Sequence, residues 1–350
     1  MEVDFLIVGH GIAGICIAEQ LEQKNASFIV LDKDQSLTSS KIAAGLYNPI
    51  TGRKMKRTWM AEALFPYLST FYRSLENKLS THFYHPKNIY RPFLSVEDQN
   101  EWIGNNLDND PFIESIYTKS TYNDFVYDPF GGLLLKHAGY VDLGDLIEAH
   151  KTLLLQKEIY REEIFDHENL LLEEGKVVYE DIKAKSIIFC DGPLSNNPYF
   201  SWVPTAPVKG EILHIETTQP LPENIIFNRG VFILKPKKKN YYRVGSTYEW
   251  KKLDWQPTEK AREQLIQKLD DLLKADYKII EQQAGIRPAS KDRRPLIGQH
   301  PEYSNVYLFN GLGTKGVSLA PYFSKQFIDS LFSDMKINEE VNISRYYSLY

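Results

Sequence analysis

The stretch VDFLIVGHGIAGICIAEQLEQKNASFIVLD, residues 3–32, decides the fold of this chain. It reads as an apolar strand, a GxGxxG turn, an apolar helix, a second apolar strand and a closing acid. In such a βαβ unit the first glycine permits the tight turn, the second lets the backbone approach a pyrophosphate and the third lets the helix lie close to the strand. The N–H groups at the start of the helix suit the phosphates, and the acid suits a ribose hydroxyl. The stretch predicts a dinucleotide site made of Gly9, Gly11, Ile12, Ala13, Gly14, Asp32 and Lys33. The alternative is a glycine-rich turn that binds no ligand.

Composition limits the class of protein. The chain has 350 residues, of which 43% are hydrophobic, which is enough for a sizeable core and about two domains. No apolar run approaches the ~20 residues that span a bilayer, and the N-terminus enters a strand directly, so we expect neither a membrane span nor a signal peptide. The two cysteines, Cys16 and Cys190, lie in apolar segments and indicate packing residues in a reducing, cytoplasmic compartment. Eight histidines without ligand spacing predict no metal site, and a net charge of −5 does not suggest bulk nucleic-acid affinity.

The order of the elements predicts two interleaved domains. Periodicity predicts helices over 58–80, 140–157 and 257–275, short strands at 170–173, 176–179 and 186–190, alternating strands within 207–250, and a strand, glycine-rich turn and helix over 303–332. Dinucleotide-type pieces lie at the start, middle and end of the chain, with strand-rich material between them. We therefore predict an α/β (α+β) fold in which a discontinuous Rossmann-like cofactor domain (1–65, 130–205 and 283–350) carries an inserted, mostly antiparallel β-sheet substrate domain (66–129 and 206–282).

Seven segments are spread across the chain in a fixed order. They are the GxGxxG turn with Asp32, SSKIAAGL (39–46), GYVD (139–142), FCDG (189–192), PVKGE (207–211), RVGSTYE (243–249) and a C-terminal set of AGIRP (284–288), Asp292, PLIG (295–298), NGLG (310–313) and GVSLAP (316–321). In order and spacing they resemble the motifs of the D-amino-acid-oxidase superfamily of flavoproteins, especially its glycine and sarcosine oxidase branch. The C-terminal set is the most specific part of the resemblance.

The resemblance implies FAD as a non-covalently bound cofactor, because no cysteine or histidine stands where a flavin linkage is expected. It implies that SSKIAAGL covers the diphosphate and approaches the flavin ring, and that Ile164 presents its backbone to the adenine. It also implies that the turn after the last strand suits negative charge on the reduced flavin. The implied FAD contacts beyond the first βαβ unit are Ser39, Ser40, Ala43, Ala44, Gly45, Leu46, Ile164, Cys190, Asp191, Gly192, Gly285, Arg287, Gly313, Thr314, Lys315, Gly316 and Val317.

The implied reaction is oxidation of a C–N bond. A hydride leaves the α-carbon of a neutral amine for the flavin, water hydrolyses the resulting imine, and oxygen or another acceptor reoxidises the flavin. A substrate that binds as the free amine needs no general base, which agrees with the absence of an obvious catalytic dyad. We therefore expect a small amino acid or secondary amine with a carboxylate as the substrate.

Three residues are candidates for the substrate site. Arg287 leads, because an arginine fork holds a carboxylate through two parallel hydrogen bonds; a domain-packing salt bridge is the alternative. Phe232 aligns with a pocket aromatic that is tyrosine in the glycine oxidase branch, so the hydroxyl is missing here. Tyr248 is a further candidate wall, together with Tyr241 and Trp250, although sheet core is the more typical place for all three.

Lys315 completes the candidate set, either as a charge at the flavin edge or as a solvated side chain. Three other positions depart from the family pattern: Lys209 stands where arginine is common, Asp191 where a small residue is usual, and Leu312 where a histidine often follows the last strand. These departures are compatible with FAD binding and leave the substrate open.

A second reading keeps the fold and changes the substrate to RNA. GLYNP (45–49) and the basic residues of 53–57 resemble the oxidase domain of the bifunctional enzyme that modifies tRNA wobble uridine, where the amine is an aminomethyl group on a base. Two further basic clusters lie at 235–239 and 291–294, although such clusters are more typical of solvated turns. Two other readings are a non-catalytic, FAD-storing scaffold and a nicotinamide-dependent dehydrogenase. The discontinuous layout disfavours the dehydrogenase.

Overall fold

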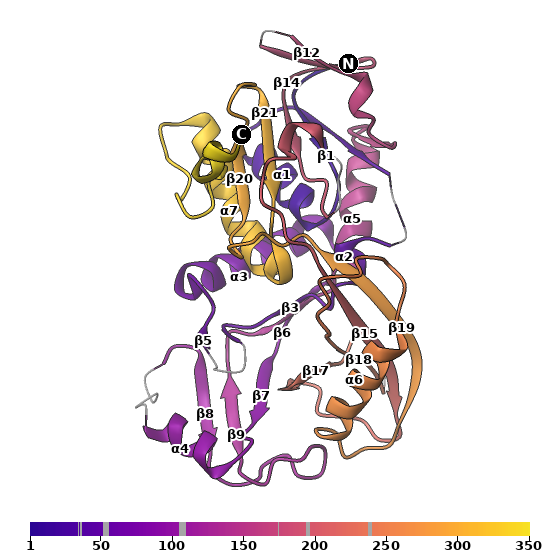
Figure 1. Ribbon diagram of the computed structural model, residues 1–350, viewed down its shortest axis with the longest axis vertical. Coiled ribbons are helices and arrows are strands. Elements are labelled where there is room, and N and C mark those ends of the chain that lie inside the picture. Colours follow the sequence, from indigo (N-terminus) through magenta and orange to yellow (C-terminus); the bar gives the residue numbers. More distant parts are fainter. Residues whose placement is uncertain are drawn as a thin grey trace.

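A mostly parallel sheet forms the half of the computed structural model that holds both chain termini (Figure 1). The structure describes residues 1–33, 35, 37–51, 56–104, 110–173, 175–193, 197–236 and 240–350. The parallel strands are β1 (Glu2–Val8), β2 (Phe28–Asp32), β11 (Tyr160–Glu162), β14 (Ile182–Phe189) and β21 (Val306–Asn310). The antiparallel strands β12 (Leu170–Glu173), β13 (Lys176–Tyr179) and β20 (Leu296–Gln299) extend the sheet. Its central strand order is β11-β2-β1-β14.

Four helices share one core on a face of this sheet. α1 (Ile12–Gln23) packs against α7 (Gly316–Phe332) and α5 (Leu143–Gln156), and α3 (Ala61–Leu79) packs against α7. Successive side chains of a strand point to opposite faces. Ile7 of β1 therefore joins the core under the helices, whereas Leu6 and Val8 join a second core with Phe200 and Val203. Burial on both faces explains why this strand is almost continuously apolar.

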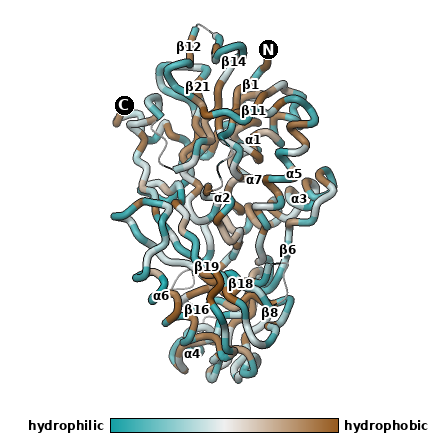
Figure 2. Tube along the Cα trace, turned by 90° about the vertical axis from the view of Figure 1, so that its right-hand side faces the viewer, coloured by the Kyte–Doolittle hydropathy of each residue, from teal (hydrophilic) through white to brown (hydrophobic). Residues whose placement is uncertain are grey.

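A second, mostly antiparallel sheet forms the other half, and apolar segments run through the strands of both halves (Figure 2). Its strands, in spatial order, are β19 (Tyr277–Arg287), β15 (Val208–Thr217), β18 (Tyr241–Gly245), β17 (Val231–Leu234), β16 (Ile225–Arg229), β7 (Asn88–Pro92), β9 (Gly132–Leu135) and β8 (Ile113–Tyr117). α6 (Glu259–Asp270) buries Leu265 and Leu269 against one face of this sheet, beside Leu213 and Phe227.

A small three-stranded sheet lies between the two large sheets (Figure 1). β3 (Leu46–Tyr47), β10 (Gly139–Val141) and β6 (Tyr84–Pro86) form a three-stranded sheet, and β4 (Ile50–Thr51) pairs with β5 (Lys56–Arg57). Further helical segments are α2 (Ser39–Ile42), α4 (Val96–Gly104) and 3₁₀ turns at His167–Asn169, Pro198–Phe200, Gly313–Lys315 and Ile343–Leu349. In the described ranges, no helix has both the length and the apolar composition needed to cross a membrane.

The architecture confirms the predicted fold class, and most elements lie where the sequence predicts them. β12 and β13 match the predicted strands at 170–173 and 176–179. β14 begins at Ile182 rather than at residue 186, because its first residues pair with β13. The domain boundaries remain a prediction. The boundary at 129/130 does not follow the sheets, since β9 lies within 130–205 and pairs with β7 and β8.

Candidate active site

Glycines shape the turn between β1 and α1. Gly9 has a positive φ of 102°, and a Cβ there would lie 2.5 Å from the carbonyl oxygen of Cys190. A Cβ on Gly14 would lie 2.0 Å from the carbonyl oxygen of Gly9. Both distances are too short for any side chain. The helix therefore packs directly on the turn, as the GxGxxG pattern predicts.

Polar groups surround the start of α1. Its N-cap, Gly11, has no capping side chain, and the Ile12 N–H donates a hydrogen bond to Ser40 Oγ at 3.1 Å. The carboxylate of Asp32, at the end of β2, accepts a hydrogen bond from the His10 N–H at 3.1 Å. Ser40 and Asp32, both predicted FAD contacts, therefore flank the glycine turn.

A buried polar chain, which the sequence analysis missed, lies beneath this turn. His10 and His150 share a hydrogen bond of 2.8 Å between ring nitrogens, His150 continues at 3.1 Å to Glu19, and Glu19 pairs with Lys78 at 2.6 Å. Burial alone raises the pKa of Glu19, but hydrogen bonds and charge from His150 and Lys78 lower it below its ordinary value. This series of hydrogen bonds and ion pairs links the glycine turn to α1, α5 and α3. The spacing of these four residues in the sequence does not predict their contact, because only tertiary packing brings them together.

One cavity of about 1860 Å³ runs from the glycine turn to the second sheet. It is larger than the ~300–1,000 Å³ of an ordinary ligand pocket, which suits a dinucleotide together with a second ligand. The predicted residues that line it are Gly9, Gly11, Ile12, Ala13, Asp32, Lys33, Ser39, Ser40, Ala43, Ala44, Gly45, Leu46, Ile164, Cys190, Asp191, Gly192, Phe232, Tyr248, Gly285, Arg287, Gly313, Thr314, Lys315, Gly316 and Val317. Gly14 lies behind the lining, in keeping with its packing role. The Ile164 side chain is 73% exposed.

Arg287 ends β19 and lines the cavity. Its Nη2 donates to Ser246 Oγ at 2.8 Å, its Nη1 donates to the Thr247 carbonyl at 3.2 Å, and its guanidinium carbon lies 4.7 Å from the centre of the Tyr248 ring. A Cβ on Gly210 would lie 1.9 Å from Nη2, so any larger residue at this position would displace the guanidinium. Burial lowers the pKa of the guanidinium, and Tyr248 opposes that shift. Within the described part of the chain no carboxylate pairs with Arg287, so none of these residues forms the packing salt bridge of the alternative.

The candidate aromatic walls have different environments. Phe232, on β17, is buried and lines the cavity. Tyr248 and Trp250 also line it but are 53% and 61% exposed, so the expectation that they form sheet core is wrong. Tyr241 is absent from the described lining, and its hydroxyl lies 2.5 Å from His214 Nδ1.

Cations gather at the glycine-rich turn before α7. Lys315 is the N-cap residue of α7 and is partly buried; burial lowers its pKa, and Arg294 and Arg293 lower it further. These two arginines and Lys291 also line the cavity. Residues 291–293 are exposed in a turn, as expected for a solvated cluster, and this turn borders the cavity. In the other two clusters, residues 53–55 and 237–239 lie outside the described residues.

Two departures from the family pattern have structural roles. Asp191 accepts hydrogen bonds from Asn197 and Asn310, each at 3.1 Å, and so ties the end of β14 to the end of β21. Leu312 is 4% exposed and belongs to the largest hydrophobic core. Hydrogen bonds therefore accommodate Asp191, and core packing accommodates Leu312.

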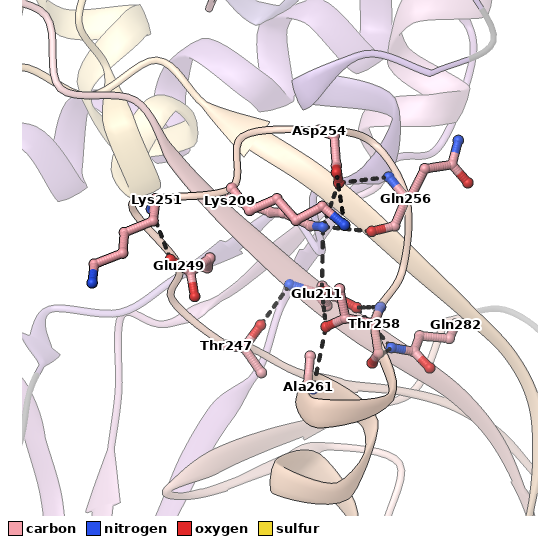
Figure 3. A network of polar contacts seen from close by, with 11 residues as sticks. Lys209, Glu211, Thr247, Glu249, Lys251, Asp254, Gln256, Thr258, Ala261 and Gln282 are labelled. Atoms are coloured by element: carbon pink, nitrogen blue, oxygen red, sulfur yellow. Dashed lines mark hydrogen bonds and ion pairs between the residues drawn. The ribbon is translucent and has the colours of Figure 1, made fainter.

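Lys209, the third departure, anchors the segment 246–258 behind the cavity wall (Figure 3). The Lys209 side chain is 1% exposed. Its Nζ lies 2.6 Å from Asp254 Oδ1 and 3.6 Å from Glu211 Oε1. Glu211 in turn accepts hydrogen bonds from the Thr258 N–H and hydroxyl, each at 2.8 Å. Since the anchored segment carries the two exposed aromatic residues, the lysine fixes part of the cavity wall.

Replacing Lys209 with methionine is expected to lower the free energy of unfolding by about 3 kcal/mol, because loss of one partner leaves buried charge uncompensated. Lys252 is a matched control, since it lies 3.5 Å from the same Asp254 carboxylate but is 69% exposed. Lys252→Met is expected to change the free energy by less than about 1 kcal/mol. Urea unfolding measures both variants. Equal effects would contradict the interpretation of Lys209 as a buried anchor.

Comparison with known proteins decides the family. The DAO family of FAD-dependent oxidoreductases matches residues 4–329. The chain belongs to this family. Its cofactor is FAD, and the residues present fit it: side-chain-free glycines form the turn, Asp32 closes the second strand, and the adjoining cavity is large enough for a dinucleotide.

Several known proteins resemble this flavoprotein. It is 26% identical to the bifunctional protein ThiO/ThiG of Trichormus variabilis, over 92% of the chain and 51% of that protein. It is 30% identical over 200 residues to the glycine oxidase of Bacillus subtilis, which covers 51% of the chain and 50% of the relative. The flavoprotein thus spans about half the length of these curated relatives.

Two further similarities bear on the fold and on the RNA reading. A solved glycine oxidase from Bacillus cereus shares the fold, with a TM-score of 0.76 at 21% identity over 96% of both chains. The tRNA 5-methylaminomethyl-2-thiouridine biosynthesis bifunctional protein MnmC of Legionella pneumophila is 23% identical, over 86% of the chain and 47% of that protein.

Proposed function

We propose that this flavoprotein oxidises the C–N bond of a small amino acid or secondary amine that carries a carboxylate. The observation that supports the proposal is Arg287, a cavity-lining guanidinium whose partners among the described residues are neutral oxygens and an aromatic ring. A guanidinium fork in this setting suits a carboxylate held by two parallel hydrogen bonds. The similarity to glycine oxidases favours the same substrate class.

The residues around the cavity divide the remaining tasks. Bound FAD supplies the acceptor for a hydride from the α-carbon. The glycine turn holds the pyrophosphate of FAD, and Asp32 holds a ribose hydroxyl. The turn at 311–317, with Lys315, offers positive charge to the flavin ring. Phe232 provides an apolar wall without a hydroxyl for the substrate. Because the substrate binds as the free amine, no side chain is assigned as a general base.

We place the protein in the cytoplasm. Cys16 and Cys190 are both free and buried, which fits a reducing compartment. Burial raises the pKa of both thiols, which suits packing residues better than redox groups.

Oxygen or another acceptor reoxidises the reduced flavin.

Absorbance spectra recorded without oxygen test the proposal. We expect flavin bands in the purified protein, and bleaching of those bands by at least one member of a panel of amino acids and N-methyl amino acids. Bands that the whole panel leaves unbleached would contradict a small amine substrate while keeping the cofactor. A colourless protein that takes up no added FAD would contradict the cofactor assignment itself.

A modified tRNA base is the second candidate substrate. The cations Lys291, Arg293, Arg294 and Lys315 around one end of the cavity favour it, as does the similarity to MnmC. If RNA is the substrate, gel-shift assays are expected to show tRNA binding that weakens steeply between ~50 and ~200 mM salt. Absence of salt-sensitive binding, with a double-stranded DNA of equal length as the control, would remove this candidate.

A further inference from the structure

Tyr248 and Trp250 form an exposed aromatic pair in the cavity lining. Their ring centres lie 6.1 Å apart with a 23° angle between the planes, which is a stacked arrangement. Aromatic side chains contribute most when buried, yet more than half of each of these side chains is exposed. Two rings that line a cavity and still face solvent offer a flat apolar surface to whatever enters.

The aromatic pair is continuous with the carboxylate anchor. The Tyr248 ring that stacks with Trp250 also contacts the Arg287 guanidinium, at 4.7 Å. The Tyr248 ring centre lies 4.7 Å from the guanidinium carbon and 6.1 Å from the Trp250 ring centre. The distance from the guanidinium carbon to the Trp250 ring centre therefore cannot exceed the sum of these two distances. A ligand whose carboxylate binds Arg287 reaches the aromatic pair with a group only a few bonds away.

Hydrogen bonds hold the backbone that carries the aromatic pair, and Figure 3 shows the one between Thr247 and Glu211. The N–H and carbonyl of Glu249, which lies between the two rings, form reciprocal hydrogen bonds of 2.9 Å with Lys209. On the other side of Tyr248, Thr247 Oγ1 accepts a hydrogen bond from the Glu211 N–H at 2.9 Å. A surface that is ordered before binding loses less conformational entropy when a ligand arrives.

We infer that the aromatic pair is a stacking subsite, and that the substrate carries a planar aromatic group within a few bonds of its carboxylate. The inference rests on the proposed function for the carboxylate at Arg287. Aromatic faces prefer offset stacks with other π systems, so the subsite distinguishes a flat ring from a saturated ring of similar size. Glycine and N-methylglycine leave this subsite unused.

The test compares three N-substituted glycines that differ only at nitrogen: N-methylglycine, N-benzylglycine and N-(cyclohexylmethyl)glycine. Each is titrated without oxygen into the FAD-loaded protein, and the flavin spectrum reports affinity and bleaching. N-benzylglycine is expected to bind about 5-fold more tightly than its cyclohexylmethyl analogue. Trp250→Leu is expected to abolish that difference, and Trp250→Phe is expected to keep most of it.

Tyr350→Leu is the matched control, because Tyr350 is as exposed as Tyr248, at 53%, and lies outside the described cavity lining. The Tyr350→Leu variant is expected to bind all three compounds as the unmodified protein does.

Equal binding of the benzyl and cyclohexylmethyl compounds to the unmodified protein would overturn the inference. So would a Trp250→Leu variant that weakens N-methylglycine as much as N-benzylglycine, since the residue would then only support the cavity wall.

Two unreactive carboxylates, phenylacetate and cyclohexylacetate, separate the subsite from the reaction. Their binding shifts the flavin spectrum without turnover. Tighter binding of phenylacetate, lost in Trp250→Leu, supports the subsite even if no amine bleaches the flavin, in which case the proposed function alone fails. Equal binding of the two carboxylates overturns the subsite whatever the amines do.

Discussion

Replacing Arg287 with methionine is expected to lower kcat/KM for the carboxylate-bearing amine by about 100-fold or more, because a buried, charge-assisted pair of hydrogen bonds is lost. Ser246 and Thr247 each accept one hydrogen bond from the guanidinium, which leaves donors of its fork for a ligand. The anchor also orients the α-carbon, so we expect kcat to fall and KM to rise. Steady-state kinetics on the FAD-loaded variant measure both parameters.

Two further variants separate charge from geometry at Arg287. Arg287→Lys keeps the charge but loses the planar fork, and its expected loss is smaller, about 10-fold. Gly210→Ala keeps the arginine but places a Cβ 1.9 Å from Nη2, so the guanidinium must move. All three variants should retain FAD, as judged by flavin absorbance. Unchanged kinetics in Arg287→Met would rule out the anchor, and loss of FAD would show that Arg287 serves the cofactor rather than the substrate.

Replacing Gly14 with alanine is expected to destabilise the protein by about 3 kcal/mol and to weaken FAD binding by about 10-fold or more. The new Cβ would lie 2.0 Å from the carbonyl oxygen of Gly9, so α1 must move away from the turn that receives the phosphates. The better helix propensity of alanine, about 1 kcal/mol, does not offset this clash. Urea unfolding of the FAD-free protein and fluorescence titration with FAD measure the two effects separately.

Gly104 supplies the control for this substitution. It ends α4, has no positive φ, and an added Cβ would meet no heavy atom of the described residues within 4 Å. Gly104→Ala is expected to change the free energy of unfolding by no more than about 0.5 kcal/mol and to leave FAD affinity unchanged. A Gly14→Ala variant that behaves like this control would show that the close approach of α1 to the turn is not required.

The sequence alone determined the features that local chain geometry controls. The strand, turn, helix and acid of residues 3–32 follow from glycine positions and apolar periodicity within one βαβ unit. The strands β12 and β13 follow from alternation and turn residues in the same way. The order and spacing of the later motifs predicted the family, and through it FAD, because they resemble the motifs of the D-amino-acid-oxidase superfamily.

Only the tertiary structure decided what surrounds each charged or aromatic side chain. Whether Arg287 met a carboxylate, whether Tyr248 and Trp250 were buried, and what compensated Lys209 all depended on the pairing of β15 with β19 and on the path of the segment 246–258. The chain of His10, His150, Glu19 and Lys78 likewise joins residues from separate elements. Such contacts link positions far apart in sequence, and their energies depend on burial and on distances of a few ångströms, which residue spacing does not encode.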